Sequence, residues 1–327
     1  MAEYTGRKVS FGVAKEATRG TAETSVDFWL PHLSLSLLPM RTKVMNESAI
    51  GSLAEFNDSD TFESFTEGSF EGKVQSESFP LLLLSAMGGL TSASNADGSG
   101  DVYDHTAVVS NTNSSQSLTL FQADGVDTYA YPLSMITTLD INAELGDFIK
   151  YSGSIVAGDE IDSVVTPAYT TATEFKPKHM SVRLASSTAG LGAASDIATV
   201  QSLRLTIDKT VERDNQFGQE TPYDISTRAV QVNGELVLRH STDTYKDNFM
   251  DNDHQAMRIT IANTDVTIGT SANPTIVLTM PKVTFESWSK DDSLNDKINQ
   301  TIGFQALLDV TTGSILTAVT TNLTASY

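Results

Sequence analysis

The amino-acid sequence predicts a mainly β protein with two tandem domains, each a β-sandwich or half-barrel with a short flanking α-helix. Apolar and polar residues alternate in several segments, and Thr, Val and Ile are common in them. Only two short segments show helical spacing. The length of 327 residues fits about two domains at ~150 residues each. The chain should therefore fold as two β domains in series.

The strands are indicated by their period-two alternation. The clearest cases are the segments 32–37, 138–145, 202–208, 257–261 and 275–280. In each of them the apolar side chains fall on one face of an extended chain and the polar ones on the other. Each segment should therefore form an antiparallel strand that has one face on a core and one in water.

Two short helices are expected. The first begins after Ser76 or Ser78, has Pro80 in its first turn and ends at Gly88. A weaker counterpart follows Ser241, where Tyr245, Phe249 and Met250 share a face. The apolar face of the first helix consists of Phe79, Leu82, Leu83, Ala86 and Met87. Both should be amphipathic.

The two helices occupy matching places in an internal repeat. Gly72 precedes the first helix and Gly234 the second, and earlier strands begin at Leu33 and Leu203. We expect the repeat to divide the chain into a first domain at 1–160, a joint at 161–175 and a second domain at 176–327.

The charge balance excludes several classes of partner. The chain has 41 acidic and 21 basic residues and a formal net charge of −20, which disfavours binding to nucleic acid and to anionic membranes. No apolar stretch has the ~18–20 residues of a membrane span, and the N-terminus lacks the apolar core of a signal peptide. With no cysteine, disulfides and thiolate metal sites are excluded. These features fit a protein made in a reducing cytoplasm.

Catalytic, cofactor and metal sites are not expected. The five histidines show no paired spacing, and the cluster 251–254 fits a polar helix exit better than a metal site. The loop 95–101 resembles the start of a calcium loop but has Thr106 where the bidentate Glu belongs. Trp29 and Trp288 are more typical of core or interface anchors than of glycan-stacking residues. We therefore predict no enzyme.

Three segments, taken in order, resemble a known family. They are the run 12–22 (GVAKEATRGTA), followed by Trp29; the run 68–74 (GSFEGKV) before the first helix; and the run 278–285 (LTMPKVTF). Their order is similar to that of tail tube proteins, also called major tail proteins, of long-tailed, non-contractile (siphovirus-type) bacteriophages. The similarity covers nearly the whole chain, in a duplicated-domain form.

The resemblance implies a structural virion protein that self-assembles into stacked rings, the phage tail tube, through which DNA and the tape measure protein pass. In this family six domains form a ring. Three two-domain chains would supply them with pseudo-sixfold symmetry, whereas a single-domain member would need six chains. The implied partners are other copies of the chain, the tape measure protein, and the tail terminator and distal tail proteins. The implied location is the virion tail, assembled in the bacterial cytoplasm.

Two sets of residues are candidates for these contacts. The polar stretches 43–66 and 212–228 are expected to be irregular and to become ordered against the next ring. Their candidate stacking residues are Ala49, Phe56, Asp58, Phe62, Phe217 and Tyr223. The alternating segment 138–145 offers three candidates for the lumen: Asp140, Asn142 and Glu144. Negative charge there would repel DNA within ~8 Å, although an acidic surface also serves solubility alone.

The alternative functions are a β-sandwich adhesin or receptor-binding component of a phage-like particle, and, more remotely, an acidic hydrolase. The tryptophans and tyrosines motivate the first, which predicts glycan or cell binding by the monomer. The second would require two carboxylates that converge in one pocket.

Overall fold

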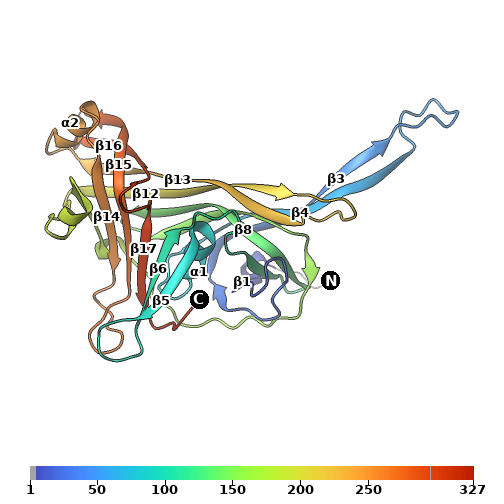
Figure 1. The fold of residues 1–327 in the computed structure, drawn as a ribbon, viewed down its shortest axis with the longest axis horizontal. Helices are drawn as coiled ribbons and strands as arrows, with labels where there is room; N and C mark the ends of the chain where they lie inside the picture. The colour runs from blue at the N-terminus through green and yellow to red at the C-terminus, as the bar shows by residue number, and fades with distance from the viewer. Residues whose placement is uncertain (1–4, 295) are drawn as a thin grey trace.

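Strands dominate the computed structural model, which describes residues 5–294 and 296–327 (Figure 1). This confirms the mainly β prediction. The strands of the first half are β1 (Ser10–Lys15), β2 (Phe28–Leu30), β3 (His32–Asn46), β4 (Asp58–Lys73), β5 (Gly88–Ser94), β6 (Tyr103–Val109), β7 (Leu118–Ala123), β8 (Thr128–Glu144), β9 (Lys150–Ala157) and β10 (Ile161–Asp162). Those of the second half are β11 (Met180–Ala185), β12 (Val200–Asp214), β13 (Asp224–Arg239), β14 (Gln255–Ala262), β15 (Thr275–Asp291), β16 (Asn299–Ala306) and β17 (Thr317–Asn322). The helices are α1 (Phe79–Met87) and α2 (Thr244–Met250), with short 3-10 turns at Gly6–Lys8, Pro177–His179 and Thr188–Gly192.

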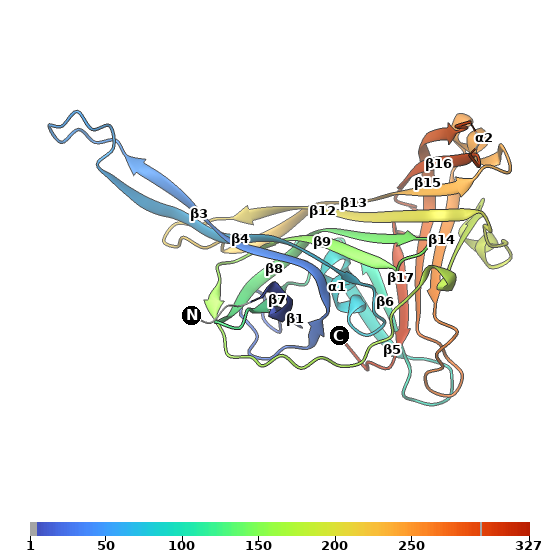
Figure 2. The same cartoon turned by 180° about the vertical axis from the view of Figure 1, so that it is seen from behind.

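One long antiparallel sheet crosses the molecule. Its strand order is β3, β4, β9, β8, β12, β13, β16 and β15. We call it the long sheet; its central strands run almost horizontally in Figure 2. The pairing of β8 with β12 joins the first half of the chain to the second. We call this contact the internal junction.

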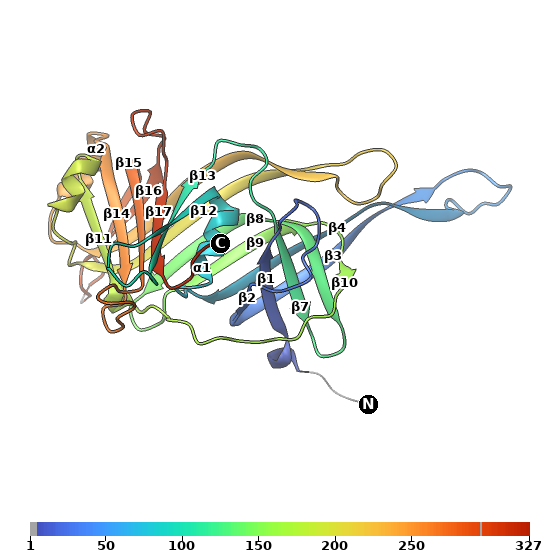
Figure 3. The same ribbon diagram turned by 60° about the horizontal axis from the view of Figure 1, so that its bottom comes forward.

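Two flanking sheets share a strand with the long sheet. The first half of β8 pairs with β7 and β10, and β7 continues to β1 and β2. In the same way the first half of β15 pairs with β14 and β17, and β14 continues to β11. Figure 3 shows the two flanking sheets on either side of α1. Each half is therefore a two-sheet unit, as expected.

The two halves repeat each other in register as well as in strand order. Leu37 pairs with Gly68, and Leu205 pairs with Gly234. In both hairpins a β-bulge follows at the same distance, after Thr42 and after Thr210. The predicted repeat is therefore present, but its expected alignment was wrong: the counterpart of Gly234 is Gly68 and not Gly72. The low sequence similarity between the halves concealed this shift.

The hairpin β5–β6, which lies between α1 and β7, has no counterpart in the described part of the second half. There a short turn connects α2 directly to β14. The hairpin extends the flanking sheet of the second half, where β6 pairs with β17. Its loop packs on the same half, since the backbone N–H of Thr270 donates to Asp97 Oδ2 at 2.8 Å. The calcium-like loop is therefore a packing element. The residues just before this loop, 91–94, are part of β5.

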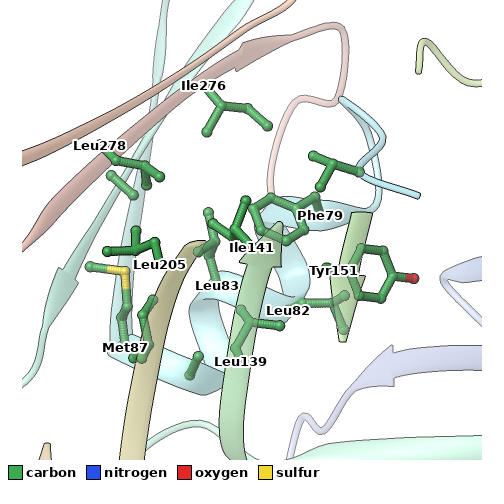
Figure 4. Packing of buried hydrophobic residues seen from close by; sticks show 14 of the residues in the cluster. Phe79, Leu82, Leu83, Met87, Leu139, Ile141, Tyr151, Leu205, Ile276 and Leu278 are labelled. Atoms are coloured by element: carbon green, nitrogen blue, oxygen red, sulfur yellow. The ribbon is translucent and has the colours of Figure 1, made fainter. Parts of the chain in front are cut away.

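Helix α1 is buried on all sides, which corrects the amphipathic prediction. All nine of its residues are buried, because the long sheet covers one side and the flanking sheet of the second half another. In Figure 4 its side chains meet Leu139 of β8, Leu205 of β12 and Leu278 of β15. The apolar core is thus continuous between the two halves. Helix α2 is more peripheral: Tyr245 and Phe249 pack against the core, and Met250 is exposed.

Two long hairpins replace the irregular stretches that we expected at 43–66 and 212–228. Strands β3 and β4 stay paired out to Asn46 and Asp58, and β12 and β13 out to Asp214 and Asp224. Both faces of these hairpins are largely in solvent, so polar residues occur on both and the period-two signal is lost. We call residues 41–63 the first arm and residues 209–229 the second arm. Both arms point toward the same end of the molecule (Figures 1 and 2).

Candidate assembly surfaces

The long sheet has one face on the core and one polar face. On β8, the buried Leu139, Ile141 and Ala143 alternate with polar residues, and strand pairing carries this alternation across the sheet. The charged residues of the polar face are Glu67, Glu71, Lys73, Asp140, Glu144, Lys150, Arg204, Asp208, Glu235, Arg239 and Asp291. Serine, threonine and asparagine fill most of the other positions. The polar face is therefore hydrophilic and carries an excess of acid.

The three residues proposed for a lumen lie together on this polar face. Asn142 and Glu144 are exposed. Asp140 is half-buried, accepts a hydrogen bond from the Thr206 hydroxyl and pairs with Arg204 Nη2 at 3.2 Å. Its charge is therefore partly compensated by the second half of the chain, so Glu144 is the freer carboxylate.

The long sheet ends in two open edges. Among residues 5–294 and 296–327, no strand pairs with the outer edge of β3 or with the outer edge of β15 beyond Val283. Several exposed apolar side chains lie on β3: Leu33, Leu38, Met40, Val44 and Met45. Long open edges with exposed apolar residues favour pairing with another chain.

The candidate stacking residues are distributed over both arms. Ala49 and Phe56 lie in the tip of the first arm, and Asp58 and Phe62 in β4. The other two, Phe217 and Tyr223, lie in the tip of the second arm. The four aromatic side chains of this set are exposed to solvent in the single chain. Phe62 and Phe217 line one shallow hollow between the arms, whereas the tip of the first arm stands apart.

The second arm rests on the base of the first. The Arg213 guanidinium lies over the Phe65 ring, 3.6 Å from its centroid, and pairs with Glu63 Oε1 at 3.0 Å. The backbone N–H of Ser64 also donates to the Glu220 carbonyl at 2.9 Å. The first arm has no comparable support on its own outer side within the described residues.

A buried carboxylate explains the Lys-Glu-x-x-x-Gly-Thr run of the sequence. Glu16 is only 2% exposed. It accepts hydrogen bonds from the backbone N–H groups of Gly20 and Leu133, both at 2.7 Å, and from the hydroxyls of Ser117 and Thr119. Leu133 has a φ of 54°, a conformation that costs a residue of this type energy and that this hydrogen bond supports. The sequence run was visible, but its structural role was not.

Two cations fasten the second arm to the first half of the chain. Arg19 Nε pairs with Asp224 Oδ1 at 2.6 Å, and the same guanidinium donates to the carbonyl of Ser115. The Lys209 amine is buried and donates to the Ser85 carbonyl at 2.5 Å and toward Ser115 Oγ at 3.4 Å. Burial, followed by the nearby charge of Arg19, lowers the pKa of Lys209 to about 7. Sequence patterns gave no signal for this buried lysine.

Within residues 5–294 and 296–327, no three His, Cys, Asp or Glu side chains gather as metal ligands. The same part of the chain contains no helix that is long and apolar enough to cross a membrane. Trp288 donates its ring N–H to Gln300 Oε1 at 3.1 Å, and Trp29 is half-buried beside Tyr169.

Comparison with known proteins gives one extensive match. A family model described as "Phage tail tube protein" matches residues 6–306. No curated protein matches the chain. Among solved structures, the chain is similar to one from a cryo-EM study of the anti-feeding prophage baseplate, symmetrised sixfold, with 15% identity and a TM-score of 0.27. That similarity covers 43% of this chain and 92% of the other.

Proposed function

Because the chain belongs to the phage tail tube protein family, and so is a structural protein of the virion tail, we propose that it assembles into closed rings that stack into the tube. Its role is structural and not enzymatic. The observation that carries this proposal is the internal junction between β8 and β12, because the chain repeats the elements on both sides of it. A second copy can add to the open edges by the same type of contact.

The repeat predicts the register of that contact. Thr138 in β8 and Ser287 in β15 both follow a β-bulge, and each of these strands belongs to both sheets of its half. Asp140 therefore corresponds to Ser289. Likewise Thr206 corresponds to Leu38, since each directly follows the leucine that pairs with a glycine in its half, Leu205 and Leu37. Asp140 pairs with Thr206 in the internal junction. In the ring, Ser289 of one copy therefore pairs with Leu38 of the next.

We propose a ring of three chains. Each chain has two corresponding halves, so three chains place six similar units around an axis with pseudo-sixfold symmetry. The domains proposed are residues 1–160 and 176–327, joined by 161–175. Ring closure places the remaining edges of the long sheet in strand pairs, which removes the exposed template for aggregation.

The polar face of the long sheet lines the channel in this proposal. Its core-facing side already packs on α1, so the polar face is the one left for water and for passing DNA. Its acidic excess repels phosphate at short range. The tape measure protein occupies the channel before DNA passes, the tail terminator and distal tail proteins bind the tube ends, and assembly takes place in the bacterial cytoplasm.

The arms are proposed to stack one ring on the next. Both point to one end of the molecule, and Phe56, Phe62, Phe217 and Tyr223 expose aromatic surface there. Exposed apolar surface that becomes covered on contact is typical of protein interfaces.

Cysteine cross-linking tests the ring because the chain has no cysteine of its own. A double variant, Leu38→Cys with Ser289→Cys, should form a disulfide between copies and give covalent species that stop at the trimer. Each single variant is a control, and so is Leu38→Cys with Asp291→Cys, which is two residues out of register. A monomeric protein without cross-links, or a covalent series that continues to the hexamer, would contradict the three-chain ring.

A further inference from the structure

The internal junction contains a buried cation, and the corresponding position at the open edge carries one as well. Lys209 directly precedes Thr210, after which the β-bulge of the second arm follows. Arg41 directly precedes Thr42, after which the matching bulge of the first arm follows. Lys209 reaches from β12 into the first half, to Ser85 and Ser115. In a ring, Arg41 reaches from β3 of one copy into the second half of the previous copy.

The segment that receives Lys209 also has a counterpart. Ser115 lies three residues before Leu118, whose pair with Ser134 is followed by a register shift. Asn252 lies three residues before Gln255, whose pair with Val283 is followed by the same kind of shift. Asn252 is therefore the counterpart of Ser115.

The charges around the two positions differ. Ser115 contacts the cation Arg19, and no carboxylate of the described residues bonds to the Lys209 amine. Asn252 instead lies between Asp251 and Asp253. All three residues are exposed, and no ion pair within 4.0 Å joins either carboxylate to another described residue.

The loop that provides Arg19 also changes. Arg19 lies between the first strand of its half, β1, and the arm strand β3. The corresponding loop of the second half, residues 186–199, contains no Lys or Arg. This loop thus brings no competing cation to the receiving surface, which offers two carboxylates that form no ion pair among the described residues.

We propose that Arg41 of one copy binds Asp251 and Asp253 of the neighbouring copy, and that this ion pair selects the correct partner edge during ring closure. The inference rests on the proposed ring. In the single chain Arg41 pairs with Asp159 at 2.8 Å, so closure exchanges a half-buried internal pair for one between copies. Opposite charges placed across an interface favour the matching partner and disfavour wrong ones.

Charge reversal tests the pairing. The variant Arg41→Glu, and separately the variant Asp251→Lys with Asp253→Lys, should each lower the assembled fraction at least tenfold by sedimentation. Combining all three changes should restore assembly toward the wild-type level. Asp159→Asn is the matched control: it removes the internal partner of Arg41 and should leave assembly intact. Thermal unfolding of each monomer shows whether the variants fold.

The outcomes separate this inference from the proposed function. Wild-type assembly of Arg41→Glu, or a folded triple variant that does not recover, would overturn the pairing while leaving the ring in place. A wild-type protein that forms neither rings nor tubes would overturn the ring itself, and the pairing with it.

Discussion

Lys209 of the second half donates a hydrogen bond from its buried amine to the carbonyl of Ser85 in helix α1 of the first half, at 2.5 Å. The contact joins the base of the second arm to the core of the other half. Because the amine is desolvated and lies near Arg19, its pKa is lowered to about 7. Folding is therefore coupled to the loss of a proton near neutral pH.

The first prediction concerns the pH dependence of stability. Between about pH 7.5 and 9.5 the unfolded chain keeps the Lys209 proton, because its pKa is then about 10.4, whereas the folded chain has lost it. Stability should therefore rise with pH by up to about 1.4 kcal/mol per unit, and fall again as the pH drops toward 7. Lys209→Met should flatten this slope in urea unfolding, and the exposed-site control Lys43→Met should not. An equally steep slope in Lys209→Met would refute the assignment.

The second prediction concerns His105, whose imidazole is fully buried. Its Nδ1 lies 2.8 Å from Ser92 Oγ and its Nε2 3.0 Å from Asn322 Oδ1. Burial lowers the pKa of His105 despite these contacts. The neutral ring thus contributes stability above about pH 6.5 that is lost as the pH falls through the lower folded value. An NMR titration should show His105 of the folded protein still neutral at a pH where the same imidazole in the urea-unfolded chain is charged; simultaneous titration in the two states would contradict this.

The third prediction concerns the buried carboxylate. Glu16→Ala leaves the N–H groups of Gly20 and Leu133 without their acceptor, and should lower the free energy of unfolding by about 3 kcal/mol. Glu55→Ala, in the exposed tip of the first arm, should change it by less than about 0.5 kcal/mol. Equal effects in the two variants would show that the hydrogen bonds of Glu16 do not stabilise the fold.

The fourth prediction uses the two matching glycines. A Cβ at Gly68 would collide with the Ser36 carbonyl, and one at Gly234 with the Arg204 carbonyl. Because backbone atoms cannot move aside cheaply, Gly68→Ala and Gly234→Ala should each cost about 1–3 kcal/mol. Gly192→Ala is the control, since nothing lies within 4 Å of its added Cβ. If all three substitutions left the free energy of unfolding unchanged, the result would contradict the close approach of the strands at Gly68 and Gly234.

The fifth prediction separates ring closure from ring stacking. Residues 48–55 of the first arm are replaced by two glycines, which leaves the Asn46–Asp58 pair in place. The Leu38→Cys, Ser289→Cys cross-link should still give a covalent trimer, while electron microscopy should show no long tubes. Tubes of normal length would show that the tip of the first arm is not needed for stacking.

The sequence predicted the strands well where a single face is buried. The segments 138–145 and 202–208 alternate because one side packs on α1 and the other is polar, and both lie in strands except for the exposed Leu145, which follows the end of β8. It failed for the arms, where water on both faces removes the pattern. It also failed for α1, because burial on all sides depends on how both halves close around the helix.

The candidate contact residues were only partly predictable. Asp140, Asn142 and Glu144 share a face because alternation within one strand fixes that relationship. The pairing of Asp140 with Arg204 joins residues from the two halves, so it required the register between β8 and β12. The same holds for Lys209, whose burial depends on contacts with the other half.

In the ring that we propose, the covalent link between the two halves changes the kinetics of assembly. One junction in every chain forms during folding, at the high effective concentration of a tethered segment. A closed ring of three then needs three bodies to meet, where a ring of unlinked single units would need six. Nucleation should accordingly depend less steeply on protein concentration, so that tubes can begin to grow at lower expression levels.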